Sequence, residues 1–345
     1  MSENAVHDYL VPEHPTGRPE GPGETFNVDR LILGDSAVVL RAFPSQSINL
    51  VVTSPPYADN RKGPYHGWPI DNYVDRFLPI TKELKRVLKP DGSFVLNIKE
   101  RANDGERQTY VLELILALKK QGWLWTEEYV WCKSNCYPGK WPNRFRDSWE
   151  RCLHFTLQKG FKMRQESVMV PVGDWAKTRL KNLSDTDRSR DESKVGSGFG
   201  KNISNWVGRD MVYPSNVLHL ATECANRDHS ATFPVSLPEW FIKLLTDEND
   251  VILDPFMGSG TSARAAINTS RHYVGVELSR DYYQVAQSAI AEAKVLAEET
   301  RRRRDGYRHT GERHIGEFGE IPQATPSSRS KPEGDYRLKE ESLPL

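Results

Sequence analysis

The chain has 345 residues and equal numbers of basic and acidic side chains, 47 of each, so its formal net charge at neutral pH is zero. This length can hold one large domain with an insertion, or two domains, and can bury a sizeable core. The sequence contains no apolar run of membrane-spanning length and does not start like a signal peptide, so we expect a soluble intracellular protein.

The first 25 residues are rich in proline and glycine, which predicts a disordered N-terminal arm, and ordered structure is expected from about Val28. The apolar run 48–53 is typical of a buried strand. It leads into Ser54-Pro55-Pro56-Tyr57.

This four-residue segment has the chemistry of a pocket for a flat amine. The exocyclic amine of a nucleobase is a poor nucleophile, so it needs hydrogen-bond acceptors, which the Ser54 hydroxyl and the Pro55 carbonyl supply. Consecutive prolines fix the backbone and remove N–H donors, and Tyr57 offers a face for an extruded base. Taken alone, Pro-Pro-Tyr is more often a strand that ends in a turn with a packed tyrosine.

Helices and strands alternate along the next part of the chain. Apolar spacing predicts a helix over 76–88, a strand over 94–96, a helix over 110–118 and a strand over 125–131. Such alternation favours a mostly parallel sheet with helices on both faces.

The segment 133–215 differs from the rest, because it is weakly periodic and contains 16 Lys or Arg against 9 Asp or Glu. A local basic excess in a neutral chain indicates that the segment as a whole contacts phosphates, whereas for any single residue a solvated surface is the better explanation. The candidates for such contacts are Arg144, Arg146, Arg179, Lys181, Arg188, Arg190 and Lys201.

A second motif lies about two hundred residues after the first. Residues 251–261 predict a buried strand, a glycine turn and a helix that begins near Thr261. A further strand, 273–276, ends at Glu277, which follows Asp254 by 23 residues. An acidic residue at this distance is placed to bind the ribose hydroxyls of a nucleoside cofactor.

Gly258 and Gly260 also fit the G-x-G-x-x-G/A pattern of dinucleotide binding, with Ala263 in the third position. The pattern alone is weak, and no hydride-accepting group accompanies it. A nicotinamide-dependent dehydrogenase is therefore disfavoured.

The four cysteines are too scattered for a disulfide framework. Cys132 and Cys136 with His154 suggest zinc at most weakly, so we predict no metal. The chain ends in an Ala-rich helix, 281–299, a run of four arginines, 301–304, and a polar tail that we expect to be disordered.

Together and in this order, the Ser-Pro-Pro-Tyr segment and Asp254-Pro255-Phe256-Met257-Gly258-Ser259-Gly260-Thr261 resemble the amino-methyltransferases of DNA, in particular their permuted beta group. The resemblance covers roughly residues 28–295. It implies an α/β, Rossmann-like S-adenosylmethionine-dependent methyltransferase fold, with a mostly parallel seven-stranded sheet, helices on both faces and an inserted target-recognition region.

The resemblance also assigns roles to residues. It implies that Ser54, Pro55, Pro56 and Tyr57 are catalytic. The implied S-adenosylmethionine pocket consists of Asp35, Thr53, Phe233, Pro234, Asp254, Pro255, Phe256, Gly258, Gly260, Thr261 and Glu277. For Asp35 the alternative is a turn acid that caps a helix.

The implied organisation divides the chain into five parts. These are a disordered arm (1–25), a catalytic half (26–132), a target-recognition and DNA-contact region (133–228), a cofactor half (229–300), and a basic run with a disordered tail (301–345).

The implied activity is transfer of a methyl group to the N4 amine of cytosine in double-stranded DNA, after the base is flipped out. No Pro-Cys dipeptide is present to methylate a ring carbon. The family implies a prokaryotic, nucleoid-associated cytoplasmic enzyme with a cognate restriction endonuclease. The alternatives left open are an N6-adenine enzyme, an RNA or protein-amide methyltransferase, and a DNA-binding protein without activity.

Overall fold

The structure, a computed structural model, describes residues 26–58, 67–103, 105–135, 143–174, 181, 208–222 and 233–310. The chain divides into two units, residues 1–300 and 301–345, and the strands found in the described residues belong to the first. The predicted arm (1–25) and the tail beyond residue 310 lie outside the described residues. No helix in the described part is long and apolar enough to cross a membrane.

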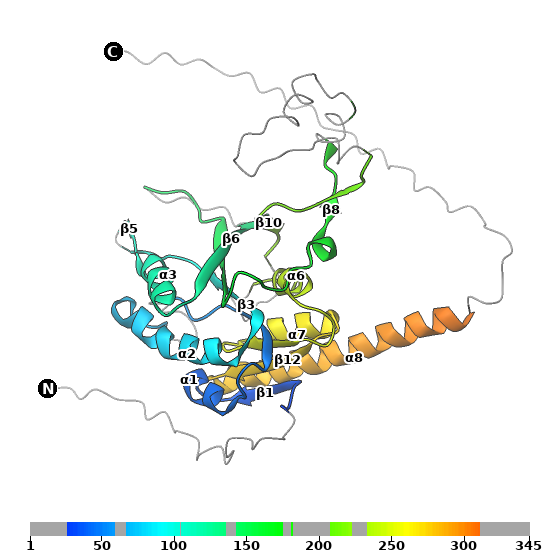
Figure 1. Cartoon of the computed structure of the whole chain (residues 1–345), viewed down its shortest axis with the longest axis horizontal. Coiled ribbons are helices and arrows are strands. Elements are labelled where there is room, and N and C mark those ends of the chain that lie inside the picture. Colours follow the sequence, from blue (N-terminus) through cyan, green and yellow to red (C-terminus); the bar gives the residue numbers. More distant parts are fainter. Residues whose placement is uncertain are drawn as a thin grey trace, which may run out of the picture. The chain divides into compact units, whose positions relative to one another are not determined.

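In the described residues, eight strands form one sheet in the order β1-β12-β11-β2-β3-β7-β6-β10. Figure 1 labels β1, β12, β3, β6 and β10 of this sheet. Along the chain these are β1 (Arg30–Leu33), β2 (Ile48–Thr53), β3 (Leu88–Ile98), β6 (Leu124–Lys133), β7 (Trp149–Thr156), β10 (Val217–Leu220), β11 (Val251–Asp254) and β12 (His272–Glu277). All neighbours are parallel except β7, which runs antiparallel to both β3 and β6. The predicted α/β fold with a mostly parallel sheet is therefore confirmed.

The predicted number of seven strands is wrong by one. Two strands of the sheet, β7 and β10, come from the range 133–228 that the sequence assigns to target recognition. β10 has only four residues and lies at the sheet edge, so it carries too short a pattern to be recognised. Two pairs of very short strands lie outside this sheet: β4 (Ala102–Asn103) with β5 (Glu106–Arg107), and β8 (Val170–Pro171) with β9 (Met211–Val212).

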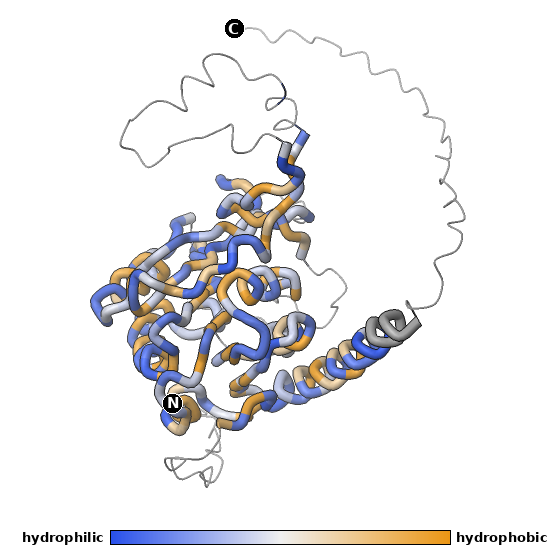
Figure 2. The backbone as a smooth tube through the Cα atoms, turned by 45° about the vertical axis from the view of Figure 1, so that its right-hand side comes forward, coloured by the Kyte–Doolittle hydropathy of each residue, from blue (hydrophilic) through white to orange (hydrophobic). Residues whose placement is uncertain are grey.

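Helices cover both faces of the sheet. One face packs against α2 (Tyr73–Val87), α3 (Tyr110–Lys120) and the 3-10 helix η1 (Leu40–Ala42), and the other against α6 (Ser236–Leu245), α7 (Thr261–Asn268) and the first turns of α8 (Arg280–Thr310). Further helical turns in the described residues include α1 (Ser36–Val39), η2 (Ile70–Asn72) and η3 (Gln165–Val168). Hydrophobic and hydrophilic residues alternate along the first turns of α8, where Ala286, Ile290 and Ala293 are buried (Figure 2).

The central strand β2 shows why the sheet needs both layers. All six of its residues are buried. Val51 packs into the cluster with α2 and α3, whereas Leu50 and Val52 pack into the cluster with α6 and α7. Successive side chains of a strand point to opposite faces, so an uninterrupted apolar run is stable only when both faces are covered.

Candidate active site

The two sequence motifs meet at the carboxyl ends of β2 and β11. These strands are parallel neighbours, with Leu253 opposite Val51, although about two hundred residues separate them. The last residues of the two strands are joined directly, because Oγ1 of Thr53 donates a hydrogen bond of 2.5 Å to Oδ1 of Asp254. The Ser-Pro-Pro-Tyr segment, which follows Thr53, therefore starts beside the glycine turn that follows Asp254.

This place is also a topological switch point. After β2 the chain continues to β3 on one side, and after β11 it continues to β12 on the other side. In open α/β sheets, ligands bind in the crevice at the carboxyl ends of such a strand pair. The fold thus puts the predicted cofactor and acceptor segments on one crevice.

Asp254 is buried and holds three segments together. Its Oδ1 accepts bonds from Thr53 and, at 3.0 Å, from the amide of Phe256, while Oδ2 accepts a bond of 2.6 Å from the Ser262 hydroxyl. Burial raises the pKa of this carboxyl to about 6, and the three hydrogen bonds counteract part of the shift. The geometry makes Asp254 the link between β2, the turn and α7.

The turn between β11 and α7 has a left-handed backbone at both glycines, with φ of +55° at Gly258 and +88° at Gly260. Gly260 precedes the first residue of α7, Thr261, and a Cβ there would lie 3.2 Å from the backbone of Ala286 in α8. Only glycine adopts this conformation without strain at such close approach.

Glu277, the last residue of β12, lies beside the same glycine turn. Its carboxylate accepts 2.7 Å bonds from the amides of Gly258 and Ser279. Burial raises the pKa of Glu277 to about 7. The amide of Leu278 also contributes a hydrogen bond, so about one of the roughly four acceptor positions of the carboxylate remains for a ligand hydroxyl. The buried acid, the glycine backbone and the half-buried Phe256 ring fit a cationic nucleoside ligand.

Phe256 and Asp35 lie at the same edge. The Phe256 ring stacks on Phe77, with centroids 5.9 Å apart, and meets Trp68 edge-on at 5.8 Å. Asp35 caps α1 by accepting a 2.7 Å bond from the amide of Ala37, which is the helix-capping role left open above. The neighbouring Ser36 hydroxyl donates to the Pro255 carbonyl, so this segment is tied to the glycine turn.

The Ser-Pro-Pro-Tyr segment is held from two sides. The Pro56 carbonyl accepts a 3.0 Å bond from the hydroxyl of Tyr73 in α2. The hydroxyl of Tyr57 donates a 2.7 Å bond to Glu150 at the start of β7. Burial and the Glu150 carboxylate raise the pKa of Tyr57 well above its usual value, while a hydrogen bond with Ser54 opposes the shift. Tyr57 is therefore a neutral phenol.

Several residues around Tyr57 escaped the sequence analysis. Glu150 and Lys133 form an ion pair of 2.6 Å, and Asn97 lies 3.5 Å from the Tyr57 hydroxyl. Glu150 belongs to the strand 149–156, which lies in a segment interpreted as target recognition, whereas Lys133 and Asn97 come from two other strands. Without the strand pairing, nothing connects these residues with Tyr57.

The other predicted residues belong to further segments, some of them outside the described part. Phe233 and Pro234 are buried just before α6, where the Pro234 carbonyl accepts a bond from Leu237. Arg144, Arg146 and Lys181 are exposed or partly exposed, and Arg144 pairs with Asp147 at 3.3 Å. Four predicted DNA contacts fall outside the described residues: Arg179, Arg188, Arg190 and Lys201.

The weak zinc alternative finds no support in the strand register. Cys132 lies opposite Trp149 and His154 opposite Glu127, so the two side chains occupy opposite ends of the β6–β7 pair. His154 bonds Ser93 at 2.9 Å, and burial lowers its pKa to about 4. Cys136 lies outside the described residues, among which no group of three His, Cys, Asp or Glu could hold a metal.

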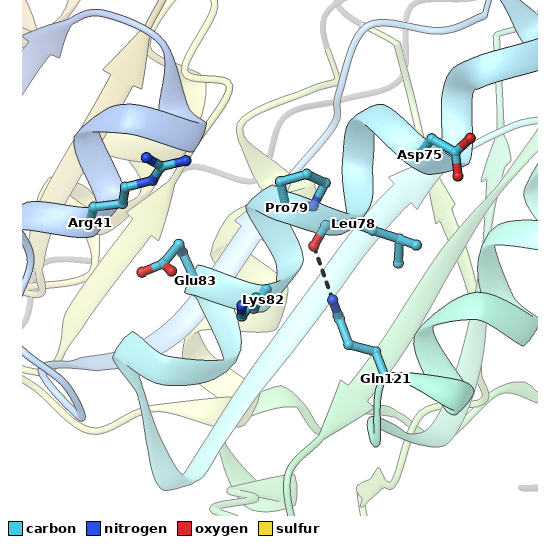
Figure 3. Close-up of a pocket in the computed structure, with 7 residues that line it drawn as sticks. All are labelled: Arg41, Asp75, Leu78, Pro79, Lys82, Glu83 and Gln121. Atoms are coloured by element: carbon cyan, nitrogen blue, oxygen red, sulfur yellow. Dashed lines mark hydrogen bonds between the residues drawn. The ribbon is translucent and has the colours of Figure 1, made fainter.

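A cavity of about 490 Å³ lies over α2, apart from the two motifs (Figure 3). It contains two basic side chains, Arg41 and Lys82, and two acidic ones, Asp75 and Glu83. Gln121 closes one side by donating a 3.0 Å bond to the Leu78 carbonyl. This balanced lining has no preference for a ligand of either charge.

The fold and the crevice define the class of the protein. Its solved neighbours include a PvuII DNA methyltransferase described as cytosine-N4-specific, with a TM-score of 0.56 and 24% identity over 79% of this chain and 93% of that one. A Thermus thermophilus protein in complex with S-adenosyl-L-methionine matches with a TM-score of 0.51 and 24% identity, over 77% of this chain and 95% of that one. The predicted Rossmann-like methyltransferase fold is confirmed.

The sequence comparisons give the family. The model of the DNA methylase family N6_N4_Mtase matches residues 48–288, so the chain belongs to this family. The type II methyltransferase M.PvuII of Proteus hauseri is 32% identical over 293 residues, covering 78% of this chain and 85% of the relative. M.BglII of Bacillus subtilis, also a type II methyltransferase, is 28% identical over 267 residues, covering 77% and 69%. The predicted family resemblance is confirmed.

Proposed function

We propose that the protein transfers a methyl group from S-adenosylmethionine to the exocyclic N4 amine of cytosine in double-stranded DNA. The observation that carries this proposal is the hydrogen bond between Thr53 and Asp254, which brings the acceptor segment and the glycine turn to one crevice. Membership of the DNA methylase family and the similarity to M.PvuII support it. The cytosine assignment follows the Ser-Pro-Pro-Tyr form and that relative.

The cofactor, when bound, supplies an electrophilic methyl group on a sulfonium. Gly258, where an added Cβ would meet only the Phe256 carbonyl within 4 Å, would leave its backbone open to the cofactor, while Gly260 lets the turn approach α8. Glu277 would accept a ribose hydroxyl, and the Phe256 ring would pack beside the methionine part. The predicted contacts of Asp35, Thr53, Pro255, Thr261, Phe233 and Pro234 complete this pocket. Asp254 contributes by fixing the turn to β2.

The acceptor side orients the amine. The Ser54 hydroxyl and the Pro55 carbonyl accept its two N–H bonds, which moves nitrogen electron density out of the ring and toward the methyl group. The Pro56 carbonyl is already occupied by Tyr73, so it helps to hold the loop. The Tyr57 ring provides the stacking face for the flipped base.

Double-stranded DNA reaches this crevice through the basic segment between the motifs. The predicted contacts are the seven Lys and Arg side chains named above, of which Arg144, Arg146 and Lys181 lie in the described part. Phosphate contacts position the duplex, and extrusion of the base then brings the amine to Ser54. The type II relatives suggest a cognate restriction endonuclease with the same recognition site.

The test is incubation of the purified protein with methyl-labelled S-adenosylmethionine and unmethylated plasmid DNA, followed by mass analysis of the nucleosides. N4-methylcytosine is expected, and sequencing that detects modified bases gives the recognition site. N6-methyladenine in its place would move the protein to the adenine enzymes of the same family. Absence of methyl transfer to DNA would overturn the proposal, and RNA and protein added in parallel test the remaining acceptors.

A further inference from the structure

The hydroxyl of Tyr57 is hydrogen-bonded to a buried ion pair, which Glu150 forms with Lys133. Oε2 of Glu150 accepts the 2.7 Å bond from Tyr57, and Oε1 accepts a 2.6 Å bond from Nζ of Lys133. Each oxygen of the carboxylate thus has its own partner. Lys133 is itself held 4.9 Å from the centre of the Trp131 ring. The carboxylate cannot turn without breaking one of these contacts.

The sheet topology explains how a residue from the middle of the chain reaches Tyr57. β7 runs antiparallel to β3, with Arg151 opposite Ile98. The amino end of β7 therefore lies at the edge where the parallel strands have their carboxyl ends. Glu150 is near the amino end of β7 and therefore lies at this edge of the sheet.

This contact fixes the direction of the Tyr57 ring. A tyrosine has two rotatable side-chain bonds, and anchoring its oxygen selects one rotamer about the first. The phenolic O–H prefers the ring plane, so the position of its acceptor also biases rotation about the second. A charge-assisted O–H···O⁻ bond is about twice as strong as a neutral one. The stacking face is thereby set before a base arrives.

A second buried carboxylate serves as a control that distinguishes the contact of Glu150 with Tyr57 from ordinary packing. Glu100 is as buried as Glu150, with 8% of each side chain exposed, and it pairs with Arg151 at 2.7 Å. Its partner is an arginine of β7, whereas Glu150 bonds the catalytic segment. The two glutamates form a matched pair that differs in contact with Tyr57.

We propose that Glu150 is a positioning residue, which acts through the Tyr57 hydroxyl to hold the stacking face for the flipped base, with Lys133 keeping the carboxylate in place. The inference rests on the proposed function, since it assumes that a base stacks on Tyr57. Glu150 takes no part in bond making.

The test compares Glu150→Ala, Glu150→Gln, Tyr57→Phe, the double variant Tyr57→Phe/Glu150→Ala and the matched control Glu100→Ala. The measured quantities are the single-turnover rate of methyl transfer to unmethylated plasmid DNA at saturating S-adenosylmethionine, the cofactor Kd by calorimetry, and the melting temperature. We expect Glu150→Ala and Tyr57→Phe to lower the rate roughly 10- to 100-fold, the factor expected for a buried hydrogen bond. Cofactor Kd should stay within about twofold.

The double variant is decisive. If Glu150 acts through the Tyr57 hydroxyl, the double variant is no slower than the slower single variant, because the same bond is lost in each. Glu150→Gln, whose amide oxygen still accepts from Tyr57, should recover part of the rate, and Glu100→Ala should transfer methyl groups at close to the wild-type rate.

The inference would be overturned if the rate losses of the two single variants multiply in the double variant, or if Glu150→Ala transfers methyl groups at the wild-type rate. If Glu150→Ala fails to fold, Tyr57→Phe and Glu150→Gln decide: unchanged rates in both refute it. These failures differ from failure of the proposed function, in which the wild-type protein itself transfers no methyl group to DNA.

Discussion

The two sides of the crevice are built in different ways. The centre of the proposed cofactor side is one continuous piece of chain, β11–turn–α7–β12, in which Gly258 and Glu277 are only 19 positions apart and joined by a 2.7 Å bond. The acceptor side is assembled from distant segments, since Tyr57 meets Glu150 across 93 positions. A site built from consecutive residues can be recognised in the sequence as a motif. A site assembled from distant strands appears in the sequence only as isolated residues.

Asp254→Ala tests the point where the two sides join, and we expect the largest effect there. The change leaves Thr53, Ser262 and the Phe256 amide without their acceptor in a buried place. The loss should be about 2–4 kcal/mol of unfolding free energy together with weaker cofactor binding. Chemical denaturation and calorimetry measure both. Asp75→Ala, at an exposed position, serves as the control, and unchanged cofactor affinity in Asp254→Ala would refute the linking role.

The cofactor side should also respond to pH. The pKa of Glu277 rises from its ordinary value of 4.5 to about 7, so the folded protein holds more protons than the unfolded chain between these values. Stability without cofactor should therefore fall as pH rises from about 4.5 to 7, by up to about 3 kcal/mol. Asp254, with its pKa raised to about 6, adds a change in the same direction.

Glu277→Gln should flatten part of this slope in denaturation curves recorded between pH 4.5 and 7.5. The exposed Glu292→Gln is the control. An identical slope in wild type and Glu277→Gln would show that Glu277 titrates normally in the folded protein.

Tyr57→Ala should affect the acceptor side alone. Loss of the stacking face should weaken binding of the extruded base by about 1–3 kcal/mol and slow methyl transfer, with cofactor Kd unchanged. Single-turnover kinetics and calorimetry separate the two.

Ser54→Ala should likewise lower turnover with nearly intact DNA affinity, and a fully active Ser54→Ala protein would contradict the role of the hydroxyl.

Gly260→Ala tests the cofactor side, and we expect a smaller effect than in the variants above. A left-handed alanine at φ of +88°, with its Cβ 3.2 Å from Ala286, should cost about 1–2 kcal/mol and displace α8 against the turn. Gly160→Ala, where the added Cβ meets nothing within 4 Å, should be neutral. Equal melting temperatures for the two variants would argue against strain at the turn.

The same contrast explains what the sequence predicted. The strand ending at Asp254, the helix starting at Thr261 and the strand ending at Glu277 appear in the structure as expected, because each has its own local pattern. The predicted helix over 110–118 matches α3, and the helix at 281–299 continues to Thr310. The positions of the DNA contacts stay predictions.

The Glu150–Lys133 pair was not predictable, because it depends on one reversed strand. Alternation within 149–156 gives a strand at most, and nothing local says that this strand enters the sheet between β3 and β6. Asp35 illustrates another limit: a Gly-Asp segment at the start of a helix fits both a cap and a ligand contact. The structure shows the cap, and the ligand contact stays a prediction.

The pairing of β2 with β11 has a consequence for synthesis of the chain. One side of β2, an entirely buried strand, lacks its neighbour until residue 254 has emerged from the ribosome, about two hundred residues later. At a synthesis rate of about 5–20 residues per second, the nascent polypeptide exposes this unpaired strand edge for roughly 10–40 seconds. Chaperone binding to ribosome-bound fragments that end before Val251 is therefore expected to be strong, and to decline once the C-terminal half is translated.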